Sequence, residues 1–121
     1  MEKIDEMLMN GVYIKFYKQP EGTIDPIAIF TRLNENGIRV RSIKMEEDAE
    51  FDMKMHTGNY YFDDFCEKYP SFSKNGPAFL ISTEVAYADE RVFIRIDDNS
   101  SIMYIETRNK DIELTDMLRK H

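Results

Sequence analysis

The run AFLISTEVAYADERVFIRIDDNSSIMYIET, residues 78–107, decides the fold because it contains three consecutive strand-like segments. Residues 78–87, 91–97 and 101–107 are rich in β-branched and aromatic side chains, which is typical of strands. The connections between them are polar and short enough to close hairpins. We therefore predict an antiparallel meander of three strands in this part of the chain.

Three further strands are predicted upstream of the meander. Residues 12–18 alternate between the apolar Val12, Ile14 and Phe16 and a second set of side chains, which predicts a strand. Residues 38–45 and 51–56 also alternate, and the acidic residues 46–48 between them suit a turn. We expect a hairpin across residues 38–56.

A helix with clear start and stop signals is predicted after Asp25-Pro26. Asp25 can cap free backbone N–H groups, and Pro26 suits the first helical position. Asn36-Gly37 supplies a left-handed stop. The predicted inner face consists of Ile27, Phe30 and Leu33, and Ile29 pairs with Leu33 at i+4.

Three more helices are predicted from apolar spacing. Residues 2–9 carry an i, i+3, i+4 set and stop at Asn10-Gly11. Asn59 can cap a helix that ends before Pro70, and Asn109 or Asp111 opens a last one. The apolar residues of these helices are Ile4, Met7, Leu8, Phe62, Phe65, Cys66, Tyr69, Ile112, Leu114, Met117 and Leu118.

The predicted element order is α-β-α-ββ-α-βββ-α. This order indicates an α+β fold, with an antiparallel or mixed sheet of about six strands and helices packed on it. No linker, repeat or low-complexity segment divides the chain, so we expect residues 1–121 to form a single globular domain. The hydrophobic fraction of 42% is high enough for such a core.

The cysteine count and the hydropathy indicate a compartment. Cys66 is the only cysteine, so no intramolecular disulfide can form. The sequence begins without a signal-peptide pattern, and it contains no apolar run that approaches the roughly eighteen residues of a membrane span. We expect a reduced, cytoplasmic protein that does not bind membranes.

The motifs of common enzymes do not occur in the sequence. It has no Gly-rich phosphate loop and no Gly-x-Ser-x-Gly elbow. Cys66 lies on an apolar stripe beside acidic residues, which favours a core position over a reactive thiolate. His56 and His121 are too few for a zinc site, although a carboxylate-only Mg²⁺ or Ca²⁺ site and paired acid–base carboxylates remain open. We expect no cofactor, no metal and no catalytic residue.

The charge of the chain is unevenly distributed. The net charge is −7, which argues against nucleic acid as a partner because phosphate binding requires Lys and Arg. Residues 32–45 carry a net +3, and residues 46–68 then carry eight carboxylates against two lysines, a net −6. Clustered like charge costs folding free energy, so it indicates either a binding surface or a solvated face that keeps the protein soluble.

We interpret the acidic segment as a surface for a basic protein. Its carboxylates would steer the encounter, and two tyrosines would form the centre of the contact. The name acidic patch refers here to Glu46, Glu47, Asp48, Glu50, Asp52, Asp63 and Asp64, and the tyrosines are Tyr60 and Tyr61.

In its general properties the chain is similar to bacterial immunity proteins and to small phage-encoded inhibitors. The shared properties are small size, acidity, tyrosine content and the lack of a catalytic motif. This similarity implies a non-enzymatic inhibitor that covers the active surface of a basic toxin or nuclease. Gene neighbourhood, above all a toxin gene directly upstream, would discriminate between this function and others.

Two other classes of function stay open. A small-ligand-binding or enzymatic domain would have a pocket between the sheet and the helices, with Tyr13, Tyr17, Arg95 and Tyr104 as its inner residues. The alternative explanation for these four residues is ordinary packing on the sheet faces with a surface arginine. The third class is a subunit of a larger assembly.

Overall fold

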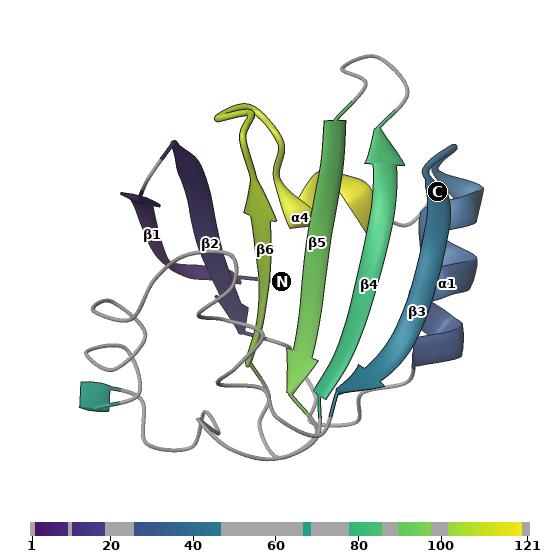
Figure 1. Ribbon diagram of the computed structural model, residues 1–121, viewed down its shortest axis with the longest axis horizontal. Coiled ribbons are helices and arrows are strands. Elements are labelled where there is room, and N and C mark those ends of the chain that lie inside the picture. The colour runs from purple at the N-terminus through teal and green to yellow at the C-terminus, as the bar shows by residue number, and fades with distance from the viewer. Residues whose placement is uncertain are drawn as a thin grey trace.

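The computed structural model describes residues 2–9, 11–18, 26–46, 67–68, 78–85, 90–97 and 102–119. Its main feature is a six-stranded antiparallel sheet with the strand order β1-β2-β6-β5-β4-β3 (Figure 1). The strands are β1 Glu2–Met9, β2 Val12–Lys18, β3 Arg39–Glu46, β4 Ala78–Val85, β5 Glu90–Asp97 and β6 Ile102–Thr107, and the helices are α1 Pro26–Glu35 and α4 Leu114–Met117. The predicted antiparallel or mixed sheet of about six strands with helices is thereby confirmed in outline, whereas the predicted element order α-β-α-ββ-α-βββ-α is not.

The C-terminal meander forms as predicted. β4 pairs with β5, and β5 pairs with β6, each antiparallel. The two upstream elements then extend the meander on opposite sides. β2 pairs with β6, and β3 pairs with β4, so β1 and β3 are the end strands of the described sheet.

The prediction of a helix at residues 2–9 is wrong, because these residues form the end strand β1. β1 and β2 make a hairpin in which Met9 pairs with Val12, which leaves a two-residue connection. Gly11 in that connection has φ of +78°, a conformation typical of Asn-Gly hairpin turns. The backbone pairing of β1 with the whole of β2 therefore stabilises a strand more than the spacing of Ile4, Met7 and Leu8 would stabilise a helix.

Helix α1 and its stop signal are confirmed, but of its predicted inner face Leu33 is buried while Ile27 and Phe30 are exposed. Gly37 has φ of +77°, and the Ile38 N–H donates to the Leu33 carbonyl over 2.9 Å, so the helix ends in the left-handed cap. The buried pair is Ile29 and Leu33, whereas Ile27 is 75% exposed. Ile29 and Leu33 face the sheet, because a narrow apolar stripe on α1 is enough to cover this part of the sheet.

The remaining helix predictions have different outcomes. The last helix begins at Leu114 after the N-cap Glu113. It does not begin at Asn109 or Asp111, because the Asn109 Oδ1 accepts the Asp111 N–H over 2.9 Å and closes a turn instead. Of the helix predicted to begin at Asn59, the structure describes residues 67–68, which are helical. Among the described residues, neither helix is long and apolar enough to cross a membrane.

Two other predictions fall partly or wholly outside the described residues. β3 pairs with β4, and residues 51–56, its predicted hairpin partner, lie outside the described residues. Cys66 also lies outside them.

The main core lies between the sheet and the two helices, which stand behind the sheet in Figure 1. On the opposite face of the sheet, the rings of Phe16 and Tyr104 are 5.4 Å apart between their centroids. All six residues of β6 are buried, so this strand is covered on both faces. The core residues on the helix side are Tyr17, Ile29, Leu33, Ile81, Val92, Ile94, Ile96, Met103, Ile105, Ile112, Leu114 and Met117.

Candidate functional site

The acidic patch has one member among the described residues. Glu46 is the last residue of β3 and pairs with Ala78. The acidic patch therefore stays a prediction. The other residues predicted to bind a partner lie outside the described ranges: Glu47, Asp48, Glu50, Asp52, Tyr60, Tyr61, Asp63 and Asp64.

The four residues of the alternative pocket do not converge on one place. Tyr13 and Tyr17 lie on the helix side of the sheet, because both alternate with Phe16 on the opposite side. The Tyr104 ring lies on the other side, where it packs against Phe16, and the backbone of Arg95 pairs with that of Tyr104. The sheet itself therefore separates Tyr104 from Tyr13 and Tyr17.

The structure instead contains a fully buried lysine, Lys15, which the sequence analysis did not single out as functional. Lys15, on β2, is 0% exposed. Its ammonium donates to the Lys110 carbonyl over 2.6 Å, to the Ile112 carbonyl over 2.5 Å and to the Glu113 Oε1 over 3.2 Å. All three ammonium hydrogens therefore have acceptors, which is the condition for burying a charge.

A β-bulge in β1 brings two more charges to this lysine. Lys3 pairs with Tyr17, but the next pair is Asp5 with Phe16, so one extra residue of β1 is inserted. Lys3 and Glu6 would point to opposite faces of a regular strand, because they are three residues apart. The bulge restores them to one face, where their side chains form a 3.1 Å ion pair and Glu6 lies 3.8 Å from the Lys15 ammonium.

Glu113 joins the lysines to Tyr17. Its Oε1 accepts from Lys3 over 3.0 Å as well as from Lys15, and its Oε2 accepts the Tyr17 hydroxyl. The same hydroxyl oxygen accepts the Leu114 N–H over 3.1 Å at the start of α4. We call Lys3, Glu6, Lys15, Tyr17 and Glu113 the lysine–glutamate network.

The pKa values of this network follow from burial and pairing. Burial, and then the hydrogen bond to Glu113, raise the pKa of the Tyr17 hydroxyl far above its ordinary value. Burial pushes the pKa of the Glu113 carboxyl upward, but the hydrogen bonds from Tyr17, Lys3 and Lys15 lower it by more. The hydrogen bond to Glu113 also raises the pKa of Lys3. The neutral hydroxyl and the ionised carboxylate are therefore the stable forms.

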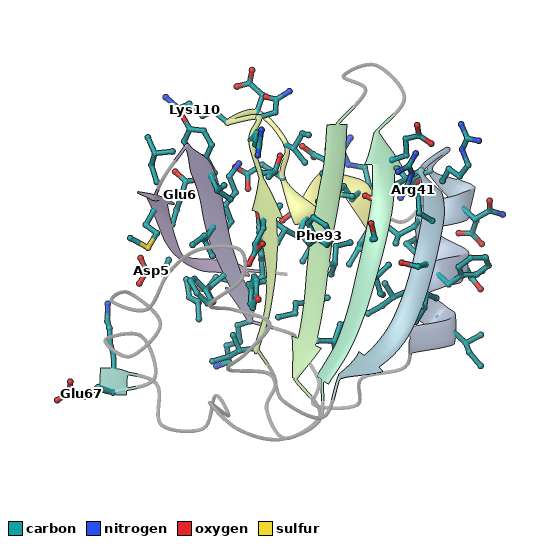
Figure 2. All side chains as sticks on the ribbon, viewed as in Figure 1. Asp5, Glu6, Arg41, Glu67, Phe93 and Lys110 are labelled. Carbon is teal, nitrogen blue, oxygen red and sulfur yellow. The ribbon has the colours of Figure 1, made fainter. Side chains whose placement is uncertain are left out.

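The lysine–glutamate network ties the segment after β6 to the β1–β2 hairpin. Figure 2 shows Glu6 and Lys110 on the side of the molecule where β1 and β2 lie, while Arg41 lies on β3 at the opposite edge of the sheet. The Lys15 ammonium contacts the Lys110 and Ile112 carbonyls and the carboxylates of Glu6 and Glu113. This arrangement positions the C-terminal segment, and with it the cleft described below.

Acid is expected to weaken this link. A carboxyl whose folded pKa is depressed stabilises the fold above its unfolded pKa, and that contribution is lost as pH falls through the folded value. Glu113→Gln should lower the free energy of unfolding by about 1–2 kcal/mol near neutral pH, since the amide still accepts hydrogen bonds. It should also flatten the loss of stability below about pH 4.5.

Urea unfolding at several pH values between about 7 and about 3 measures both effects. Glu2→Gln is the matched control, because Glu2 is an exposed carboxylate of β1 outside the network. An unchanged acid slope in Glu113→Gln would show that Glu113 does not carry this pH dependence.

A cleft of about 190 Å³ opens beside the C-terminal segment. It lies between the end of α1 and the residues that lead into α4. Its walls combine apolar side chains with acceptor groups. The lining residues are Asn36, Ile38, Asp111, Ile112, Glu113, Asp116 and Met117.

Asn36 fixes one wall of this cleft. Its Nδ2 donates to the Met117 carbonyl over 2.7 Å and to the Arg119 carbonyl over 3.0 Å, which links α1 to the region of α4. Its Oδ1 is buried and has no hydrogen-bond partner among the described residues. Sequence reasoning assigned Asn36 to the helix stop alone, and no local pattern indicates contacts made across eighty residues of chain.

Two further observations concern metal binding and the comparison with known proteins. Within the described part of the chain, no three His, Cys, Asp or Glu side chains are grouped so as to hold a metal ion. Searches against protein-family models, curated proteins and solved structures returned no match to this chain. The proposals below therefore rest on the charges and contacts of the chain itself.

Proposed function

We propose that this protein is a non-enzymatic, cytoplasmic binding domain that captures a basic protein through the acidic patch. The most specific form of the proposal is a small acidic inhibitor, such as a bacterial immunity protein that neutralises a basic toxin or nuclease. The observation that carries it is the net charge of −6 in residues 46–68. Such a concentration of charge raises the rate of association with an oppositely charged surface.

The described structure supports the proposal at the place where the acidic segment begins. Glu46 ends β3, an end strand of the described sheet. The basic residues that precede it already have a partner in the fold, because Arg39 and Arg41 lie 3.3 and 3.6 Å from the two carboxylate oxygens of Glu84. Because these arginines pair with Glu84 on β4, they are less available to neutralise the acidic segment that follows them in the sequence.

A small-ligand-binding domain is the second candidate, because of the cleft beside α4. Among the described residues, the cleft is lined by Asn36, Ile38 and the C-terminal segment and not by Tyr13, Tyr17 or Tyr104. If the protein were an enzyme or a ligand carrier, this cleft would be the place to look for the ligand. The charge distribution favours the binding of a protein.

The test compares the chain with a variant in which Glu46, Glu47, Asp48, Glu50 and Asp52 are replaced by their amides. The partner is the product of a neighbouring gene or a protein captured from the source cell, then purified. Neutralisation should slow association more than it speeds dissociation, and added salt should slow association of the parent chain, since the Debye length is about 8 Å at physiological ionic strength. Stopped-flow association kinetics measure both.

Tyr60→Ala and Tyr61→Ala provide the complementary readout. If either tyrosine is an anchor, its removal should raise the dissociation rate by an amount equivalent to about 1–3 kcal/mol and leave association nearly unchanged. Tyr13→Ala serves as a comparison from the folded sheet. Unchanged kinetics after neutralisation of the whole segment would reduce the acidic patch to a solubility feature.

A further inference from the structure

The end strand β3 carries positive charge in a chain whose net charge is −7. The Arg39 side chain is 78% exposed, and its guanidinium lies 3.3 Å from Glu84 Oε2. The Arg41 guanidinium lies 3.6 Å from Oε1 of the same carboxylate. Among the described residues, Glu84 is the only carboxylate that pairs with either arginine. One negative charge therefore faces two positive charges at this edge of the sheet.

These two arginines meet on the face of the sheet that lies away from the helices. Ile81 on β4 belongs to the core on the helix side, and Glu84, three residues later on the same strand, points to the opposite face. Arg39 is the register partner of Glu84. Because the Arg41 guanidinium reaches the same carboxylate, both positive charges lie on this face.

The helix-side face of β3 is apolar. Val40 pairs with Thr83, and Ile43 pairs with Ile81. The register shift between Val40 and Ser42 inserts one residue, which returns Ile43 to the helix side. Val40 packs against the core, whereas Ile43 is 41% exposed although its partner Ile81 is fully buried. Ile43 therefore has room for a further apolar neighbour.

Helix α1 adds to the apolar character of this edge. It lies behind β3 at the end of the sheet (Figure 1). Ile27 and Phe30 on α1 are exposed, so three of the four large apolar side chains exposed in the described part of the chain belong to α1 and β3. The fourth, Leu8, lies on β1 at the other end of the described sheet. Exposed apolar side chains that gather at one edge are typical of an interaction surface.

We propose that β3 accepts an extended segment of a partner protein as an additional strand, and that this segment alternates carboxylates with apolar side chains. Backbone hydrogen bonds along a sheet edge supply affinity in this mode of binding, and the side chains on the two faces supply specificity. Successive residues of a strand point to opposite faces, so the carboxylates would lie beside Arg39 and Arg41. The apolar residues between them would lie beside Ile43.

This inference goes beyond the proposed function, because the acidic patch is expected to bind a basic surface whereas β3 would bind an acidic segment. Negative charge elsewhere on the chain has little effect on this edge, since the Debye length is about 8 Å at physiological ionic strength. The test below needs neither the acidic patch nor its natural partner. A failed test therefore leaves the association kinetics of the acidic patch to be judged separately.

The test is an NMR titration of the full chain with a capped peptide of alternating glutamate and valine, eight residues long like β3. We expect saturable shifts of the Ile43 methyl groups. Hydrogen exchange of the β3 amides that point away from β4 should slow about tenfold at a peptide concentration about ten times Kd. Two control peptides of the same length should not saturate these signals at that concentration. One alternates lysine with valine, and the other places all glutamates before all valines.

The variant Arg39→Gln/Arg41→Gln then tests the charges. It should weaken binding of the glutamate–valine peptide about threefold to tenfold, the range for two exposed ion pairs. Lys18→Gln/Lys110→Gln removes the same charge from exposed positions outside β3 and should leave the affinity unchanged. Lys110 lies on the side of the molecule where β1 and β2 lie (Figure 2). Equal weakening in both double variants would overturn the site in favour of general charge attraction.

Other results would also overturn the proposal. Binding of the lysine peptide at the same concentration would exclude an acidic occupant. Slow exchange of all β3 amides before peptide is added, or no saturation by any peptide, would mean that the edge is closed to a partner and that the arginines and the bulge only prevent strand pairing. Sedimentation tests for a second copy as the occupant, which a dimer of the parent chain that Arg39→Gln/Arg41→Gln dissociates would establish.

Discussion

Lys15→Met is expected to lower the free energy of unfolding by about 3–5 kcal/mol, the loss typical of breaking a buried ion pair from one side. Methionine fills a similar volume but donates no hydrogen bond. The carbonyls of Lys110 and Ile112 would lose this donor, and the Oε1 of Glu113 would keep only Lys3. Since the Lys15 ammonium is fully buried, water cannot replace it without opening the segment after β6.

Urea unfolding near neutral pH measures this loss. The control is Lys18→Met, which makes the same substitution three residues further along β2 at an exposed position and should change stability by less than about 0.5 kcal/mol. Equal effects of the two substitutions would show that Lys15 stabilises the fold only as part of β2. A loss confined to Lys15→Met would identify its contacts with residues 110–113 as the cause.

The parts of the fold that sequence predicts well are those fixed by local signals. The meander from β4 to β6 follows from strand-like residues between short polar turns, and α1 follows from Pro26 at its start and Gly37 after its end. Each signal acts through the backbone conformation of one or two residues. Contacts with distant parts of the chain therefore rarely change the structure that such signals predict.

The strand β1 shows where local reasoning fails. The spacing of Ile4, Met7 and Leu8 is helical, but the strand contains a bulge that breaks simple alternation. The sequence of β1 therefore follows neither the helical period nor the strand period throughout. The better signal is Asn10-Gly11 between segments of eight and seven residues, which is typical of a tight hairpin. The prediction gave the apolar spacing more weight than the turn.

The lysine–glutamate network could be predicted only in part. Tyr13, Lys15 and Tyr17 share one face of β2, and a lysine between two tyrosines suggests a half-exposed strand. Its burial depends on residues 110–113, which lie almost one hundred positions away in the sequence. Asn36 lies 81 and 83 positions from the two residues whose carbonyls accept its hydrogen bonds, so the cleft beside α4 carries no local signature either.

Tyr17→Phe is expected to lower the free energy of unfolding by about 1.5–3 kcal/mol, because hydrogen bonds to charged groups lie in this range. The ring stays in the core, so the packing of β2 against β6 is preserved. The substitution removes the donor to Glu113 Oε2 and the acceptor of the Leu114 N–H at the start of α4. The free N–H at the start of α4 adds to the cost, since Glu113 makes no side-chain cap there.

The effect of Tyr17→Phe should also depend on pH, and this separates the hydroxyl from the ring. The pKa of Tyr17 is raised above its ordinary value of 10, so the folded protein keeps a proton that the unfolded chain loses above that pH. Stability of the parent chain therefore falls as pH rises past about 10, and the Phe variant lacks this loss. The difference in unfolding free energy between them should shrink between about pH 8 and about pH 11. Tyr13→Phe, on the same face of β2, should follow the parent chain within about 0.5 kcal/mol. A constant difference across this pH range would mean that Tyr17→Phe acts through packing and not through its hydrogen bond to Glu113.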